Sequence, residues 1–169
     1  VVLRVLMPDQ LVPQISILPR GDAGGFIEHI ETEVGRVPDL DTMRRELSVL
    51  LGGRAGEDGD GSSLTSGASG DLRKATDLAF MIVGQWGLSE DFGLISVDAV
   101  RRQVSEDLKA RQEAAVNKLL DEALANAKAI VAANAVVISA LVEALLKRET
   151  LLEADLNEFW KTNKVVMPA

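Results

Sequence analysis

The sequence has no cysteine and no tyrosine, and its only histidine is His29. Without cysteine the chain can form neither a disulfide nor a thiolate metal site, and this fits a reducing compartment. A serine nucleophile would need a histidine base, and His29 lies on a predicted strand, where a lone histidine is more often a surface or core residue than a catalyst. No His-Glu-x-x-His motif occurs anywhere in the chain.

Aromatic residues make up only 4% of the chain, so its core must consist mostly of Leu, Val, Ile and Ala, which favours helices. The formal net charge is −8 and no basic stripe is present, which argues against nucleic-acid binding. The most apolar stretch, residues 129–146, is interrupted by Asn134 and Glu143. It therefore predicts a buried core helix rather than a membrane span. The length of 169 residues suits one domain.

Three common site motifs are also missing. No Gly-x-x-x-x-Gly-Lys-Ser/Thr phosphate loop occurs. The acidic segment 58–63 resembles the start of a calcium loop, but Ser63 and Ser69 stand where the sixth-position glycine and twelfth-position glutamate are needed. "GASGD" (67–71) departs from the Gly-x-Ser-x-Gly elbow at its last position.

The first part of the chain, residues 1–70, has a mixed pattern. Residues 1–7 suit a helix end or a short strand, and 14–21 and 24–30 predict two strands, antiparallel to each other. A helix begins near Asp41, with Asp41 or Thr42 as its cap, and Gly52-Gly53 ends it. Residues 52–70 contain seven glycines and predict a loop.

The second part, residues 71–169, predicts an antiparallel helical lobe. A helix spans 71–86, and a long helix follows Ser96; the polar patch "KARQE" (109–113) interrupts its apolar pattern, and the sequence leaves open whether the patch breaks the helix. Asn134 is a possible cap for a further helix that ends near Arg148. The Thr-x-x-Glu spacing at 150–153 predicts a capping box and a short last helix through Trp160. The expected fold is mainly α, with a small antiparallel sheet or hairpin in the N-terminal part.

Asp71 stands where the glycine-rich stretch meets the helical pattern. From the residues alone, the favoured role of this acid is to cap its helix or to interact with the positive end of the helix dipole. Several segments nevertheless occur in an order that resembles a known family: "ISILPRG", "GGF", "LLGGRAGED", "TSGASGDLRKATDLA", "VGQWGLSEDFG" and "LLKRETL". Together they resemble the peptidase domain of FtsH-type ATP-dependent zinc metalloproteases.

The resemblance implies a metal role for Asp71. In this family the aspartate of the Gly-Ala-x-x-Asp-Leu segment is the third protein ligand of the catalytic zinc, and Asp71 matches that position. The other two ligands are the histidines of a His-Glu-x-x-His helix, whose glutamate acts as general base on the zinc-bound water. That motif would lie just upstream of Val1, so we expect no catalytic residue in this chain and no peptidase activity from it alone.

The resemblance also suggests supporting residues. Glu57 in "GGRAGED" matches the first glutamate of the corresponding family segment. It would not bind the zinc itself but would orient the residues that do; a solvated loop acid is an equally good interpretation. Arg54 is expected to pair with a nearby acid. Gly25, Phe26 and Ile27 fall where the family has an edge strand that can bind an extended substrate through main-chain hydrogen bonds. An ordinary sheet strand is the alternative there.

The function implied is a zinc-dependent endopeptidase domain of an ATP-dependent protease that degrades unfolded or membrane proteins. Its partners would be unfolded polypeptides and further copies of itself, since relatives form hexamers. The chain would be a soluble fragment on the cytoplasmic side, whereas relatives are membrane-anchored by regions absent here. The alternative is a non-catalytic FtsH-like binding or assembly module without metal, and a third interpretation is an unrelated helical scaffold.

Overall fold

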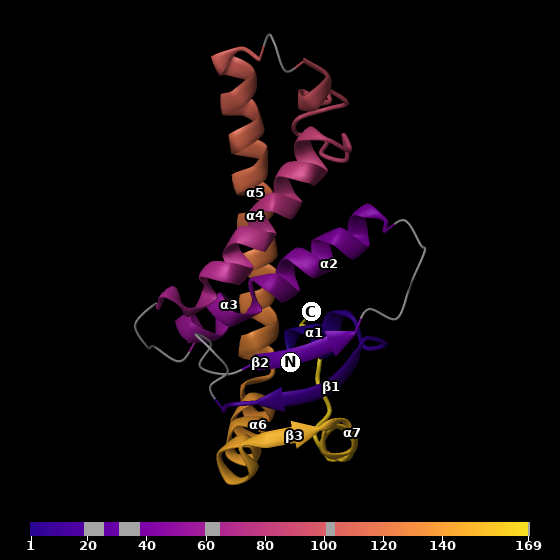
Figure 1. The fold of residues 1–169 in the computed structure, drawn as a ribbon, viewed down its shortest axis with the longest axis vertical. Helices are drawn as coiled ribbons and strands as arrows, with labels where there is room; N and C mark the ends of the chain where they lie inside the picture. Colours follow the sequence, from indigo (N-terminus) through magenta and orange to yellow (C-terminus); the bar gives the residue numbers. More distant parts are fainter. Residues whose placement is uncertain (19–25, 31–37, 60–64, 101–103, 169) are drawn as a thin grey trace. The chain divides into compact units, whose positions relative to one another are not determined.

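The computed structural model describes residues 1–18, 26–30, 38–59, 65–100 and 104–168 (Figure 1). The chain's contacts fall into two compact units. Unit 1 consists of Val1–Val37 and Lys128–Ala169, and unit 2 consists of Pro38–Ala127. The organisation expected from the sequence, a single domain with a division at residue 70, stays a prediction.

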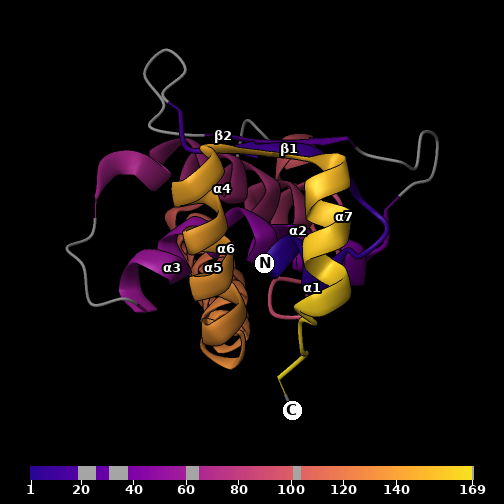
Figure 2. The ribbon, with the colours of Figure 1, turned by 90° about the horizontal axis from the view of Figure 1, so that it is seen from below.

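Unit 1 contains a three-stranded antiparallel sheet with strand order β2-β1-β3. Two of the strands form the hairpin predicted near the N-terminus, and the third comes from far along the chain. Figure 2 shows α6 and α7 on one face of this sheet. The elements of the unit are α1 (Val2–Leu6), β1 (Leu11–Ser16), β2 (Phe26–Ile30), α6 (Ala135–Arg148), β3 (Thr150–Leu152) and α7 (Glu153–Thr162).

The central strand β1 begins earlier than predicted and includes Pro13. A proline has no N–H to give to a ladder, so it is disfavoured in a central strand unless the pairing is irregular. The pairing of β1 with β2 shifts between Leu11 and Gln14, at the position of Pro13. Beyond that point Ile15 pairs with Ile27 on one side and with Leu151 on the other.

The core of unit 1 joins the sheet to its helices. Leu141 and Leu145 of α6, Leu151 of β3 and Leu156 of α7 are all buried in one cluster. Partly buried apolar side chains pack around them: Val1, Val12, Ile15, Ala144, Phe159 and Trp160. The Phe159 and Trp160 rings meet edge to face, with their centroids 4.9 Å apart.

The last helix starts differently from the prediction. Thr150 does not cap α7; it belongs to β3, and its hydroxyl hydrogen-bonds the Ser16 hydroxyl at 2.8 Å. The cap function falls to Asp155, whose Oδ2 accepts a hydrogen bond from the Leu152 N–H at 3.1 Å. Asp155 also pairs with Arg148 at the end of α6. Three residues of strand therefore precede the helix, although the helix itself was predicted correctly.

Asn134 lies at the break between α5 and α6 and is 2% exposed. Its side chain makes no capping bond to α6. Instead its Nδ2 donates to the Ile130 carbonyl at 2.8 Å and to the Val166 carbonyl at 2.9 Å, while its Oδ1 accepts from the Val166 N–H at 2.8 Å. This buried amide therefore holds the segment that follows α7.

All the regular secondary structure of unit 2 in the part that the structure describes is helical, joined by turns such as the segment 85–96. Its elements are α2 (Leu40–Leu50), α3 (Gly52–Gly59), the 3-10 turn η1 (Ser66–Ala68), α4 (Ser69–Gly84), the 3-10 turn η2 (Val97–Val100) and the larger part of α5 (Glu106–Ala133). Helices α2, α4 and α5 share one core, in which Leu47, Ile82 and Val83 are fully buried. The N-terminus of α2 is capped by Asp39, whose carboxylate accepts the Thr42 N–H at 2.8 Å, and not by Asp41 or Thr42.

Two further predictions for unit 2 are wrong: the loop over residues 52–59 and the start of the long helix after Ser96. Residues 52–59 form helix α3 instead of a loop. The side chain of Ala55 is buried at 1% exposure, and its N–H donates a helical hydrogen bond to the Leu51 carbonyl at 3.0 Å. The sequence leaves open whether the polar patch 109–113 breaks the long helix, and in the structure α5 runs through it, with four of its five side chains exposed. The helix predicted from Ser96 begins only at Glu106.

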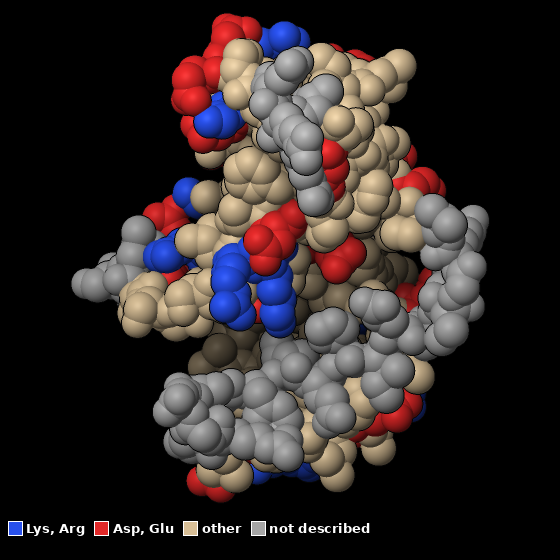
Figure 3. All heavy atoms as spheres, turned by 45° about the horizontal axis from the view of Figure 1, so that its top comes forward, with Lys and Arg blue, Asp and Glu red and all other residues tan. Residues whose placement is uncertain are grey.

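No single helix of the described residues is long and apolar enough to cross a membrane. Helices α5 and α6 meet that length and composition only when they are counted together across the break at Asn134. The surface in Figure 3 shows acidic and basic side chains mixed on one face.

Candidate functional site

Asp71 lies in the first turn of α4 and is exposed. It is not the N-cap, which is Ala68 and makes no side-chain capping bond. Its Oδ1 lies 3.8 Å from the Lys74 Nζ, one helical turn further on, in an exposed pair that adds little stability. The carboxylate is thus held on a rigid helix start, where the helix dipole favours a negative charge and a ligand can reach it.

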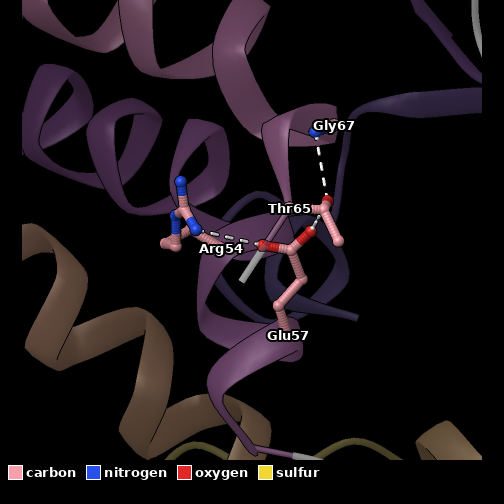
Figure 4. Close-up of polar contacts among 4 residues, drawn as sticks. All are labelled: Arg54, Glu57, Thr65 and Gly67. Carbon is pink, nitrogen blue, oxygen red and sulfur yellow. Dashed lines mark hydrogen bonds and ion pairs between the residues drawn. The ribbon is translucent and has the colours of Figure 1, made fainter. Parts of the chain in front are cut away.

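A chain of polar contacts lies directly before this helix (Figure 4). Arg54 Nη1 donates to Glu57 Oε2 at 3.3 Å. The Thr65 hydroxyl donates to the other oxygen, Glu57 Oε1. The same hydroxyl oxygen accepts the Gly67 N–H at 3.1 Å. These contacts connect α3 to η1, which runs directly into α4.

The local sequence explains this arrangement. Arg54 and Glu57 are three residues apart on α3, a spacing that places side chains on one helix face. Thr65 is the N-cap of η1, a position that favours a hydroxyl because its oxygen can accept a free N–H of the first turn. A Cβ at Gly67 would lie 3.2 Å from the Thr65 Oγ1, so a larger residue there would displace this side chain by a few tenths of an ångström. Glu57 is 21% exposed and belongs to a helix, so it is not a solvated loop acid.

The proposed substrate strand is described only in part. Gly25 lies outside the described residues, and for Phe26 and Ile27 the structure gives the backbone alone. That backbone belongs to β2, which lies at one edge of the sheet. One side of β2 pairs with β1. His29 lies on the same strand. The placement of β2 is compatible with both the substrate-strand and the ordinary-strand interpretation.

A zinc ion is not accommodated by the described residues alone. They contain no group of three His, Cys, Asp or Glu side chains close enough to hold a metal ion. Asp71 is a single oxygen donor, and structural and catalytic zinc sites use three or four protein ligands. Two cavities in the described part of the chain, about 140 and 130 Å³ in volume, are not lined by Asp71 or Glu57. Both are smaller than an ordinary small-molecule site.

Thr65 is the residue that the sequence interpretation missed. It falls inside the glycine-rich segment 52–70 that the sequence predicts to be a loop, although a threonine followed by Ser-Gly and then a helical pattern is a recognisable N-cap position. The structure gives it contacts on both sides, to Glu57 and to Gly67. The expected pairing of Arg54 with a nearby acid is confirmed, with Glu57 as the partner.

Comparison with known proteins agrees with the resemblance in the sequence. A Streptococcus pneumoniae protein named ATP-dependent zinc metalloprotease FtsH is 30% identical over 170 residues, which is 95% of this chain and 26% of that protein. The protein of the same name from Thermus thermophilus is 34% identical over 153 residues, 83% of this chain and 24% of that protein. The chain thus spans about a quarter of the length of these relatives. The family model described as Peptidase family M41 matches residues 1–159, and the chain therefore belongs to this peptidase family.

Proposed function

We propose that the chain is the peptidase part of a longer zinc-dependent endopeptidase, and that Asp71 is one of its zinc ligands. The observation that carries this proposal is the position of Asp71, an exposed carboxylate in the first turn of α4, within the segment matched by the family model. The two remaining ligands and the general base would come from a His-Glu-x-x-His motif upstream of Val1.

The 169 residues alone are expected to be inactive. They contain one histidine and no cysteine, so a site with two histidines and one aspartate cannot be assembled from one copy. A lone carboxylate binds zinc weakly, because affinity depends on several ligands held in place together. Titration of this chain with Zn²⁺ should give no stoichiometric binding, and stoichiometric binding would contradict the proposed ligand set.

The proposed substrates are unfolded or membrane proteins, as the resemblance in the sequence implies, and the relatives' printed name supports an ATP-dependent process. Support comes from the edge position of β2, since an extended segment can add to such an edge through main-chain hydrogen bonds, with little demand on its sequence. Gly25, Phe26 and Ile27 would make this contact. Assembly into a hexamer and a position on the cytoplasmic side of a membrane belong to the same proposal.

Glu57 is proposed to support the metal site indirectly. Its carboxylate is hydrogen-bonded by both Arg54 and Thr65, and the second of these reaches the turn that leads into α4. A residue that does not bind the metal itself can still raise metal affinity by holding the ligand residues in the right orientation. Glu57→Gln should therefore weaken zinc affinity in the longer protein while its helical content stays the same.

The test begins with the coding sequence upstream of Val1. If it encodes His-Glu-x-x-His, the chain extended through that motif should bind one zinc ion and hydrolyse a fluorescently labelled unfolded casein. Asp71→Asn should abolish both properties. Asp77→Asn, an exposed aspartate on the same helix, is the matched control and should leave both unchanged. Full activity of Asp71→Asn would refute the proposed ligand.

The alternative is a non-catalytic module that binds or assembles with other proteins and holds no metal. An upstream sequence without the two histidines would exclude the peptidase proposal. Pull-down experiments would then ask which proteins the chain binds.

A further inference from the structure

The hydroxyl of Thr65 connects two helices of unit 2. It donates to Glu57 of α3 and accepts the N–H of Gly67 in η1. A threonine hydroxyl has one donor hydrogen and acceptor lone pairs, so both of its capacities are used here. A valine of the same shape could make neither contact, whereas a serine could make both.

The acid that receives the Thr65 hydroxyl is itself held in place. Glu57 and Arg54 are 21% and 26% exposed, and Arg54 binds the oxygen that Thr65 does not use. A partly buried carboxylate with both oxygens hydrogen-bonded has few alternative orientations. The partner of Thr65 on α3 is therefore a carboxylate whose orientation is restricted by its own hydrogen bonds and partial burial.

The Thr65 hydroxyl oxygen also accepts a hydrogen bond from Gly67, in the turn that leads into α4. Gly67 approaches so closely that a Cβ at this position would lie 3.2 Å from the Thr65 Oγ1 and 4.0 Å from the Glu57 Oε1. Residues 66–68 form η1, and α4 follows at Ser69 without a break. Asp71 lies four residues after Gly67, about one helical turn along. Ala68, the N-cap of α4, contributes no side-chain bond, and the bond from the Gly67 N–H to Thr65 lies in the turn directly before it.

We propose that Thr65 is a positioning residue for Asp71. Through Gly67 it fixes the first turn of α4 relative to Glu57, and thereby the place of the Asp71 carboxylate. This inference rests on the proposed function only for its consequence, because fixing the carboxylate matters for catalysis only if Asp71 is a ligand.

Hydrogen exchange of the 169-residue chain tests the positioning itself. In Thr65→Val the amides of residues 67–71 should exchange about fivefold to thirtyfold faster, the range that corresponds to losing one or two net hydrogen bonds. The amides of Ile82 and Val83, near the other end of α4, should keep their rates. Thr65→Ser should restore the slow exchange at 67–71. Thr76→Val is the matched control, since the Thr76 hydroxyl bonds only the Leu72 carbonyl of its own helix.

Three results would overturn the proposal. The first is an unchanged exchange rate at 67–71 in Thr65→Val, and the second is an equal acceleration along all of α4, which would indicate general destabilisation. A failure of Thr65→Ser to restore the rates would equally exclude a role for the hydroxyl.

Kinetics of the longer protein separate this inference from the proposed function. Thr65→Val should lower kcat about tenfold or more with KM within about twofold, as expected when a ligand is displaced by a fraction of an ångström. Thr65→Ser should recover kcat. If Asp71→Asn abolishes activity while Thr65→Val retains full kcat, the positioning role is wrong and the ligand proposal stands. If Asp71→Asn retains activity, the proposed function fails regardless of Thr65.

Discussion

The buried amide of Asn134 is predicted to hold the C-terminal segment of unit 1 in place. Its side chain makes three hydrogen bonds, two of them to the main chain of Val166. The substitution Asn134→Ala removes all three. Because Asn134 makes no capping bond to α6, no loss of a helix cap adds to the effect.

The expected cost follows from these contacts. The Ile130 carbonyl also accepts the Asn134 main-chain N–H at 3.1 Å, so it keeps a partner in the variant. Val166 is 51% exposed, so water can reach its freed N–H and carbonyl. Each of the two bonds to Val166 then contributes about 1 kcal/mol, and Asn134→Ala should cost about 2 kcal/mol. For a chain of this size that lowers Tm by about 4–8 °C.

Thermal unfolding followed by circular dichroism measures the total loss, and hydrogen exchange locates it. The Val166 amide should lose its protection in Asn134→Ala, while the amide of Ile82 in unit 2 keeps its own. The control is Asn117→Ala, an exposed asparagine on α5, which should leave Tm unchanged or raise it slightly because alanine favours helix.

The reasoning would be refuted by a Tm within about 1 °C of the parent together with a protected Val166 amide. An equal loss in Asn117→Ala would also refute it, because the effect would then not depend on the Val166 contacts.

Three further predictions concern stability. Leu47→Ala, at a fully buried core position, should cost about 3 kcal/mol or more in urea denaturation. Glu149 has a φ of 61°, so Glu149→Gly should raise stability by about 0.5 kcal/mol, and any loss would argue against strain at this residue. The hydrogen bond from Lys118 to Asp91 raises the pKa of Lys118 above its ordinary value of 10.5. Its stabilisation is therefore complete below that pH and lost as the pH rises through the folded pKa, so the Tm difference between the parent and Lys118→Ala should shrink in strongly alkaline buffer.

Much of the fold could be predicted because its signals are local. The apolar spacing in α4 and the Phe26–Ile30 strand each depend on neighbouring residues, and both elements are present. The glycine-rich α3 could not be predicted in this way, since glycine disfavours helix by about 1 kcal/mol per residue and the compensating burial of Ala55 is a tertiary effect. β3 was missed for a similar reason, because a three-residue strand exists only through its pairing with β1, far away in the sequence.

One part of the candidate site could likewise be predicted from the sequence, and another part could not. The position of Asp71 at a helix start could be predicted from the change of pattern at residue 71, and the exposed first turn agrees with it. The link from Glu57 through Thr65 to Gly67 could not, because it depends on a contact between side chains eight residues apart whose intervening segment has no regular pattern. Its role as support for a zinc ligand stays a prediction.

The division of the chain into two units affects the order in which they can fold while the chain is being synthesised. Unit 2 is one uninterrupted stretch, Pro38–Ala127, whereas unit 1 needs residues from both ends of the chain. On the ribosome, β1 emerges before unit 2 but cannot pair with β3 until residues 150–152 have been made, more than a hundred residues later. During that interval one side of the hairpin has no strand to pair with, and unpaired strand edges are sites of aggregation. Because the whole of unit 2 is made before β3, it can fold first, and the sheet of unit 1 is completed last.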